Sequence, residues 1–195
     1  MSDSATLDRI YERLYSFRVR EFLRIIPKDY LATPLGAVPV PSRFSDPDLT
    51  YAVLYGAQTL ACGFCEAVLR DQLDYKKTRC LPRRFIEDRH VVTFHAAEKL
   101  YLVDLRGDAA VKMGAPTGVA HDTLHAEGQK FSSLVYHLIA SADGIVYDSR
   151  FTGDACICIF DKRFPQLAID RVLPLKSHRD IYDILDAYGI TLISG

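Results

Sequence analysis

The chain changes from a strand pattern to a helix pattern within residues 50–73, which read TYAVLYGAQTLACGFCEAVLRDQL. Side chains at alternate positions share one face of a strand, so Tyr51, Val53 and Tyr55 predict a strand over residues 50–56. From residue 58 the apolar side chains recur at intervals of three and four, which predicts an amphipathic helix over about 58–73. The apolar stripe of that helix is Leu60, Ala61, Phe64, Cys65, Val68, Leu69 and Leu73.

Strands and helices are mixed on both sides of this unit. Apolar residues at helical spacing predict an N-terminal helix within residues 4–22 and another helix over 129–141. A last helix is expected after Ser177, because Ser177 and Asp180 fit a capping box. Five further segments have strand character: 91–94, 100–105, 145–148, 156–160 and 169–174. No regular strand–helix–strand rhythm is present, which indicates an α+β fold.

Residues 27–50 are expected to form an ordered loop. Prolines and a glycine interrupt them throughout and forbid a long helix: Pro27, Pro34, Gly36, Pro39, Pro41 and Pro47. Loops of this length in compact domains are usually functional.

Composition indicates one globular domain over residues 1–195. The chain is 49% hydrophobic, with 10 Phe and 11 Tyr, which is enough to build a core. A formal charge of -1 predicts no surface for nucleic acid or an anionic membrane. We expect neither a signal peptide nor a membrane span, because no apolar stretch approaches about 20 residues. Five cysteines, an odd number, are expected to be reduced thiols in a cytoplasmic protein.

Several short motifs have ordinary structural explanations. Cys62 and Cys65 have the CxxC spacing of redox and zinc sites, but they lie inside the predicted helix and no second pair exists. His121 and His125 are four residues apart, without a matching carboxylate. Cys156 and Cys158 alternate with isoleucines in a predicted strand and are expected to be buried. The sequence therefore predicts no metal site and no bound cofactor.

Glu66 is also unremarkable when it is considered alone. On a helical wheel it lies far from the apolar stripe, and Arg70 follows four residues later in the favourable order for an ion pair. Arg43, Tyr55 and Ser149 likewise fit a surface loop, a half-buried strand and a turn. Periodicity assigns no function to any of the four.

The order of these residues along the chain resembles the RES-domain family. An Arg-Phe pair (Arg43, Phe44), a Leu-Tyr strand ending near Tyr55, and Glu66 about three helical turns later follow the family pattern. Residues 143–150, DGIVYDSR, closely resemble a later block that contains Ser149, and residues 102–105 resemble the central strand. The resemblance covers about residues 24–161, with an N-terminal and a C-terminal helix expected to flank this core.

The resemblance implies a fold, an activity and a set of site residues. The fold would be an ADP-ribosyltransferase-like mixed β core flanked by helices. The activity would be cleavage of the nicotinamide–ribose bond of NAD, as substrate, by phosphorolysis with phosphate as co-substrate or by hydrolysis. Glu66, Arg43 and Ser149 would be catalytic, and Arg24, Arg43, Tyr55 and Ser149 would bind NAD. An upstream arginine belongs to the pattern, and Arg18 and Arg24 both fit; Arg24 is preferred because its distance to Arg43 suits the family better.

The chemistry of these residue types agrees with that activity. Cleavage develops positive charge on the ribose, as in glycoside hydrolysis, and a carboxylate at Glu66 would stabilise it. The arginine forks suit a pyrophosphate, and the ring of Tyr55 could pack on nicotinamide. Relatives include toxins of toxin–antitoxin pairs, so an antitoxin is an expected partner. Two alternatives stay open, namely a protein ADP-ribosyltransferase and a non-catalytic RES-fold binding module.

Overall fold

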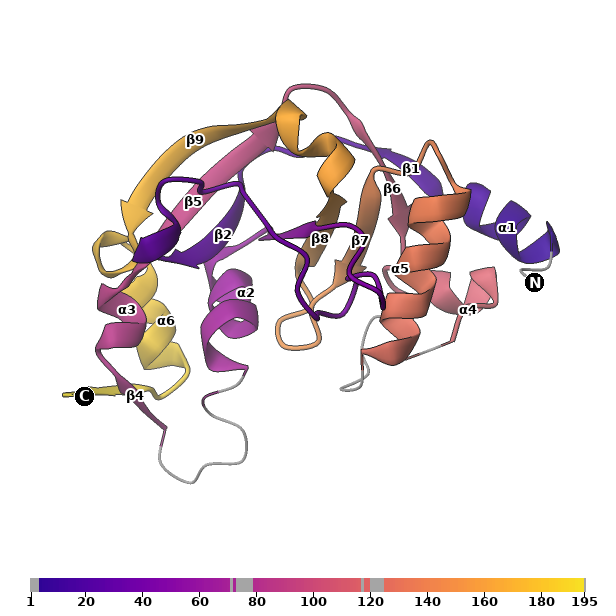
Figure 1. Cartoon of the computed structure of the whole chain (residues 1–195). Coiled ribbons are helices and arrows are strands. Elements are labelled where there is room, and N and C mark those ends of the chain that lie inside the picture. The colour runs from indigo at the N-terminus through magenta and orange to yellow at the C-terminus, as the bar shows by residue number, and fades with distance from the viewer. Residues whose placement is uncertain (1–3, 71, 73–78, 117, 120–124, 195) are drawn as a thin grey trace.

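The computed structural model describes residues 4–70, 72, 79–116, 118–119 and 125–194. Its main feature is a curled sheet of eight strands in the order β1-β6-β7-β8-β3-β2-β5-β9 (Figure 1). The strands are β1 (Leu14–Phe17), β2 (Phe22–Pro27), β3 (Val53–Ala57), β5 (Arg89–Ala96), β6 (Leu100–Asp104), β7 (Gly144–Asp148), β8 (Ala155–Phe160) and β9 (Leu167–Pro174). The β6–β7 pair is parallel and the other pairs of this sheet are antiparallel. A separate parallel pair joins β4 (Cys80–Pro82) to β10 (Thr191–Ile193).

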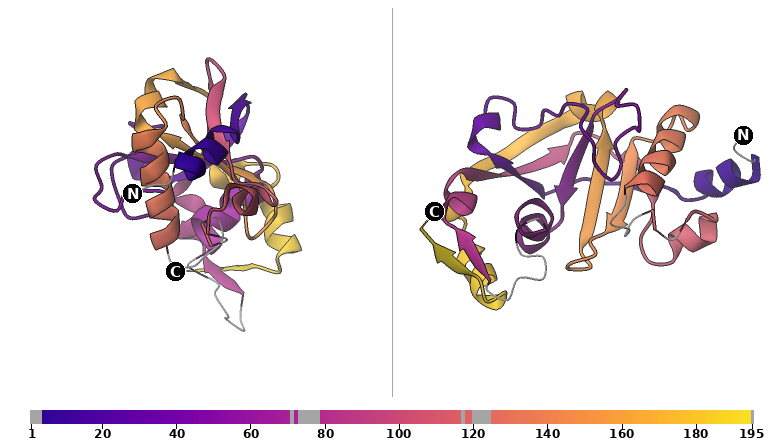
Figure 2. Two further views of the ribbon diagram at one scale, coloured as in Figure 1. Left: turned by 90° about the vertical axis from the view of Figure 1, so that its right-hand side faces the viewer. Right: turned by 60° about the horizontal axis from the view of Figure 1, so that its bottom comes forward.

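Helices are distributed along the sheet from one end of the molecule to the other (Figure 1). They are α1 (Ser4–Tyr11), α2 (Leu60–Phe64), α3 (Arg84–Glu87), α4 (Ala109–Met113), α5 (Ala126–Leu138) and α6 (Ile181–Ala187). The helix α1 lies at one end of the molecule and β10, beside the C-terminus, at the other (Figure 2, right). The helix α5 contacts β7. The mixture of helices with a mixed sheet confirms the predicted α+β class. None of the described helices combines the length and apolar character that crossing a bilayer requires.

Two cores lie on opposite faces of the sheet. The larger core packs α2, α5 and α6 against strand residues such as Leu23, Ile25 and Cys158. The smaller core consists almost wholly of strand side chains, among them Phe22 and Leu54, inside the curl of the sheet. Because strand side chains alternate between faces, membership of a core shows which face each strand residue occupies.

The central strands β2 and β3 pair at one position only, Leu23 with Ala57. Beyond that pair they separate, and each continues with its other neighbour, β2 with β5 and β3 with β8. Residues 28–52 connect these two strands, where the sequence predicts a loop over 27–50, and they begin with a short 3₁₀ turn at Lys28–Tyr30. Their irregular structure confirms the proline-based prediction.

The predicted N-terminal helix over residues 4–22 is wrong beyond residue 11. The helix α1 ends at Tyr11, and β1 then pairs with β6 from Leu14 to Phe17. Leu14 and Phe17 continue the helical spacing by coincidence, while Tyr15 and Phe17 are residues that favour strands. Pairing with β6 decides the local structure, since helix propensity is a weak preference that tertiary contacts override.

The predicted capping box at Ser177 is also wrong. Asp180 precedes α6 directly, and its side chain caps no backbone N–H. Ser177 belongs to a separate 3₁₀ turn, Leu175–Ser177. A capping box needs its acidic residue inside the first turn of the helix, whereas Asp180 occupies the position just before it.

Candidate active site

Glu66 lies in a π-helical turn that continues α2. The helix begins after Thr59, whose hydroxyl accepts a hydrogen bond from the Cys62 N–H at 3.2 Å. Residues Cys65–Leu69 then widen into π geometry (η2), with Arg70 N–H donating to the Cys65 carbonyl at 2.9 Å. Such turns occur often at functional sites because they shift the direction of the side chains around them. The half-buried Glu66 is thereby presented on a widened turn rather than on a regular solvated helix.

The helix carrying Glu66 lies very close to the sheet. A Cβ atom at Gly63 would come within 2.7 Å of the Leu23 side chain and 3.5 Å of the Ala57 Cβ. Glycine therefore permits this approach at the one position where β2 and β3 still pair. The position of Glu66 relative to the sheet follows from this contact.

Ser149 holds the Glu66 carboxylate. The Ser149 hydroxyl donates to Glu66 Oε1 at 2.7 Å and accepts from the Phe151 N–H at 3.2 Å. Ser149 is buried, and its backbone N–H bonds to the Asp154 carbonyl at 2.8 Å in the turn between β7 and β8. The hydroxyl proton is thus directed at the carboxylate. One oxygen of the Glu66 carboxylate is therefore fixed by Ser149, which lies 83 residues away in the sequence.

The segment around Arg43 is held from several sides. The Phe44 carbonyl accepts from Ser132 Oγ at 2.6 Å, and the Ser42 carbonyl accepts from the Gln129 amide at 3.1 Å. A Cβ atom at Gly128 would come within 2.5 Å of the Arg43 carbonyl oxygen, so α5 can lie against this segment only because residue 128 is glycine. The loop is therefore rigid at Arg43, which favours a defined position for its guanidinium.

Tyr55 completes the support of that segment. Its hydroxyl oxygen accepts from the Phe44 N–H at 2.8 Å, and it shares a hydrogen bond with Ser42 Oγ at 3.0 Å. Burial raises the pKa of Tyr55, so the hydroxyl stays neutral and can form the hydrogen bonds with both Phe44 and Ser42. The sequence suggested that its ring packs on nicotinamide; the structure adds that its hydroxyl positions Arg43.

Arg43 and Glu66 act on each other electrostatically. Burial is the main cause that lowers the pKa of Arg43, Arg150 lowers it further, and Tyr147 and Glu66 raise it. The structure therefore brings Arg43, Tyr55, Glu66 and Ser149 together, and we call these four residues the Glu66 cluster. They come from the long loop, β3, the end of α2 and the β7–β8 turn.

Arg24 is placed differently. Its neighbours Leu23 and Ile25 belong to the larger core, and the partly buried Tyr55 packs against that core. By alternation Arg24 faces the other side of the sheet, at the point where β2 and β3 separate. Its Nη1 donates to the Gly36 carbonyl at 3.3 Å, and burial lowers its pKa to about 10. The alternative upstream arginine, Arg18, is exposed in the connection between β1 and β2.

The cysteines do not act as a CxxC pair. Cys62 Sγ lies 3.3 Å from Cys156 Sγ, whereas the thiol of Cys65 bonds to Tyr188, and all five cysteines are free thiols. Cys156 and Cys158 are buried in β8, as predicted. His121 lies outside the described residues. Within the described part of the chain, no three His, Cys, Asp or Glu side chains gather in a way that could hold a metal ion.

Comparison with known proteins identifies the family. The model of the RES domain matches residues 21–181. The chain belongs to the RES-domain family. Arg24 and the whole Glu66 cluster lie within the matched residues, and Arg18 lies before them.

Two individual proteins are similar to this RES-domain chain. "Probable toxin y4kH" of Sinorhizobium fredii (strain NBRC 101917 / NGR234) is 34% identical over 97 residues, which are 49% of this chain and 76% of that protein. A solved structure of the M. tuberculosis MbcT-MbcA toxin-antitoxin complex contains a chain with a TM-score of 0.63 and 14% identity, covering 88% of this chain and 92% of that one. At this identity the second similarity shows the shared fold alone.

Four residues that support the site were not among the predicted site residues: Gly128, Gln129, Ser132 and Tyr51. Ser132 donates to Phe44 and accepts from the Tyr51 hydroxyl at 2.8 Å. These contacts join segments more than 80 residues apart. No local signal marked them, since Gly128 precedes the helix predicted over 129–141 and falls inside α5 only because that helix begins at Ala126.

Proposed function

We propose that this RES-domain protein cleaves NAD at the bond between nicotinamide and ribose. The observation that carries the proposal is the Glu66 carboxylate, held by the Ser149 hydroxyl at 2.7 Å and coupled to Arg43. Breaking that bond leaves positive charge on the ribose, while the electron pair of the bond goes to the nicotinamide nitrogen and neutralises the pyridinium. A carboxylate fixed beside the ribose stabilises this state without further reorganisation.

Each member of the Glu66 cluster has a distinct role in this proposal. Glu66 places its second carboxylate oxygen against the ribose, because Ser149 occupies the first. Arg43 binds the pyrophosphate through its planar fork. Tyr55 positions Arg43 through Phe44 and Ser42 and lends its ring to the nicotinamide. Arg24 remains the proposed second phosphate-binding arginine because it matches the family pattern and no described carboxylate pairs with it, although its side chain leaves the other face of the sheet from Tyr55, where β2 and β3 separate.

The acceptor of the ADP-ribosyl group is proposed to be phosphate or water. With phosphate, NAD would give nicotinamide and ADP-ribose 1-phosphate; with water it would give nicotinamide, ADP-ribose and a proton. NMR of NAD incubated with the purified protein, with and without phosphate, distinguishes the two by their products. Label transferred from NAD onto a protein would indicate an ADP-ribosyltransferase instead, and NAD that stays intact in both buffers would contradict the proposal and favour a binding module.

We further propose that the protein is the toxin of a toxin–antitoxin pair. One relative is named a probable toxin, and the solved complex of similar fold contains a toxin with its antitoxin. An antitoxin segment bearing a carboxylate could block the site by pairing with Arg43 or Arg24. Expression in a bacterial host tests this. Wild-type protein should deplete cellular NAD and arrest growth, whereas Glu66→Gln should do neither; wild-type accumulation at normal NAD would contradict it.

A further inference from the structure

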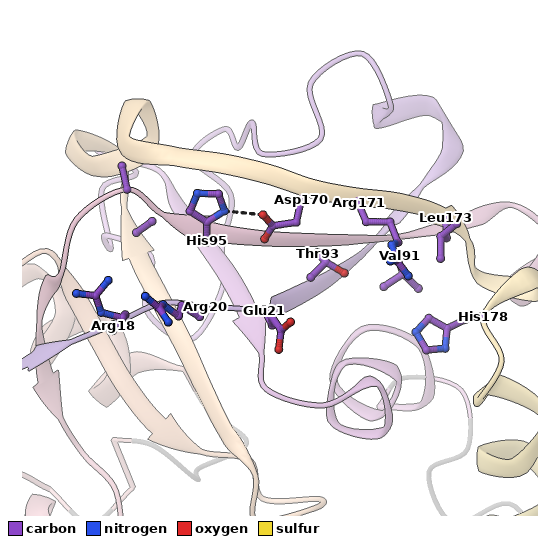
Figure 3. A pocket seen from close by; sticks show the side chains of 12 residues that line it. Arg18, Arg20, Glu21, Val91, Thr93, His95, Asp170, Arg171, Leu173 and His178 are labelled. Carbon is purple, nitrogen blue, oxygen red and sulfur yellow. Dashed lines mark hydrogen bonds and ion pairs between the residues drawn. The ribbon is translucent and has the colours of Figure 1, made fainter.

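A large open pocket lies on β5 and β9, at the other end of the sheet from β7. Its volume is about 760 Å³, within the range of small-molecule sites. Polar side chains from four segments line it: Arg18, Arg20, Glu21, Thr93, His95, Asp170, Arg171 and His178. We call these eight residues the basic pocket (Figure 3). It shares no lining residue with the Glu66 cluster.

The pocket wall is shaped by a β-bulge. Thr93 pairs with Arg171 and Phe94 pairs with Ile169, which leaves Asp170 as the extra residue of β9. Bulges redirect side chains near functional sites. Here Asp170 Oδ1 reaches His95 Nδ1 at 2.7 Å, and Arg171 also lines the pocket (Figure 3). The contact fixes the His95 ring and leaves its Nε2 as the nitrogen that can meet a ligand.

The two N-terminal arginines are held by the residue between them. Val19 is fully buried in the smaller core, and its carbonyl accepts from the Ala96 N–H at 3.2 Å. Arg18 and Arg20 flank it and lie together at one end of the pocket, with His178 at the other end (Figure 3). Glu21 follows with a φ of 54°, a left-handed conformation that turns the chain into β2. The anchored backbone at Val19 thus places the guanidiniums of Arg18 and Arg20 in the same pocket.

The three guanidiniums of the pocket, on Arg18, Arg20 and Arg171, have no protein partner among the described residues. Of the two carboxylates that line the pocket, Asp170 is engaged by His95, and Glu21 bonds to none of the three arginines. Three planar forks in one open cavity suit an anion with several oxygen atoms, such as a phosphate chain. The half-buried side chain of Leu173 adds apolar surface beside them, which a flat ring could cover, whereas Val91 is buried in the larger core.

We propose that the basic pocket binds a nucleoside diphosphate or triphosphate, with its phosphates on Arg20 and Arg171 and its base beside Leu173. The site would be separate from the Glu66 cluster, and the inference does not depend on NAD cleavage. Arg18 and Arg20 precede residues 21–181, which match the RES model, and the other lining residues lie within the matched range.

Calorimetry with ADP, pyrophosphate, adenosine and hexaglutamate tests the proposal. ADP should bind to the full chain, pyrophosphate more weakly and adenosine not measurably. Arg20→Ala combined with Arg171→Ala should weaken ADP binding at least about 10-fold, the scale of one lost hydrogen bond to a charged group. Arg179→Ala, which removes an exposed arginine outside the pocket, is the matched control and should change nothing.

Three results would overturn the proposal. The first is unchanged ADP affinity in the double variant. The second is an equal loss of ADP affinity in Arg43→Ala, which would place ADP at the Glu66 cluster. The third is tighter binding of hexaglutamate than of ADP, which would indicate a surface for acidic peptides. Amide shifts in NMR of the wild-type protein provide an independent readout. ADP should move the signals of Thr93, His95 and Arg171, and shifts confined to Glu66 and Ser149 would contradict the assignment.

Discussion

The middle of the sheet and one of its ends present their charged groups in opposite ways. In the middle, formed by β7, β8 and β3, Glu66 is bonded to buried Ser149, and the Arg43 segment is held by Tyr55 and Ser132. At the end formed by β2, β5 and β9, the guanidiniums of Arg20 and Arg171 face open space without described partners. Catalysis needs groups fixed before the reaction begins, whereas binding of a charged ligand tolerates mobile arginines. The contrast predicts chemistry in the middle of the sheet and binding at its end.

Removal of the Arg43 fork should have the largest effect on substrate binding. Arg43→Ala should weaken NAD binding about 10-fold or more, because hydrogen bonds between charged groups contribute about 1.5–3 kcal/mol. Arg43→Lys should restore only part of the affinity, since a point charge cannot form two parallel hydrogen bonds. Calorimetry on the Glu66→Gln background measures this without turnover, with Arg179→Ala as the control. Wild-type affinity in Arg43→Ala would place the NAD site elsewhere.

Ser149→Ala should reduce turnover rather than binding. It removes the hydrogen bond that fixes Glu66 Oε1, so kcat should fall about 10-fold while KM changes little, on the same scale for a bond to a charged group. Steady-state kinetics with NAD gives both parameters. Ser141→Ala, at an exposed position, serves as the control. A rise in KM alone would show that Ser149 binds substrate without orienting the carboxylate.

Tyr55→Phe separates the support that the hydroxyl gives to the Arg43 loop from the contact that the ring would make with nicotinamide. The ring stays, but the Phe44 N–H loses its acceptor, which should lower the free energy of unfolding by about 1–3 kcal/mol. Because Arg43 loses part of its support, KM for NAD should also rise, by less than in Arg43→Ala. Urea unfolding together with kinetics measures the two effects. Full stability in Tyr55→Phe would mean that the hydroxyl does not hold the loop.

Arg24→Met should have the smallest effect, with opposite signs for stability and binding. Burial lowers the pKa of Arg24 to about 10, so the folded state disfavours the charge that the residue carries at neutral pH. Its removal should raise Tm, and the stability of the wild type should gain from this group as pH rises above about 10. NAD affinity should fall modestly. Unchanged affinity with a raised Tm would remove Arg24 from the site.

Much of the fold was predictable because long periodic segments determine their own structure. The strands β6, β7, β8 and β9 and the helix α5 lie within a few residues of their predicted ranges. The short strands β1 and β2 were missed. In β1, Leu14 and Phe17 happen to continue a helical spacing, and only pairing with β6 decides otherwise. Both strands depend on partners that are distant in the sequence, β6 for β1 and β3 and β5 for β2, which no local pattern reveals.

The site was predictable only through resemblance to the family. A helical wheel places Glu66 away from the apolar stripe, and the wheel does not apply in a π turn. The contact with Ser149 joins two distant segments, and the role of the Tyr55 hydroxyl depends on where the Arg43 loop crosses β3. No sequence motif marks the basic pocket. Arg20 and Arg171 line the same pocket because β5 lies between β2 and β9 in the sheet.

Nicotinamide release from NAD by matched variants tests the central claim most directly. Purified wild type, Glu66→Gln, Glu98→Gln and the double variant of Arg20 and Arg171 would be assayed together, with Tm confirming that each is folded. Glu98 is an exposed carboxylate in the turn between β5 and β6 and is the control. Glu66→Gln should lose about 10²-fold or more of the rate, the usual scale for one transition-state contact, while the other two variants match the wild type. A folded Glu66→Gln protein that releases nicotinamide at the wild-type rate would contradict the assignment of the chemistry to the Glu66 cluster.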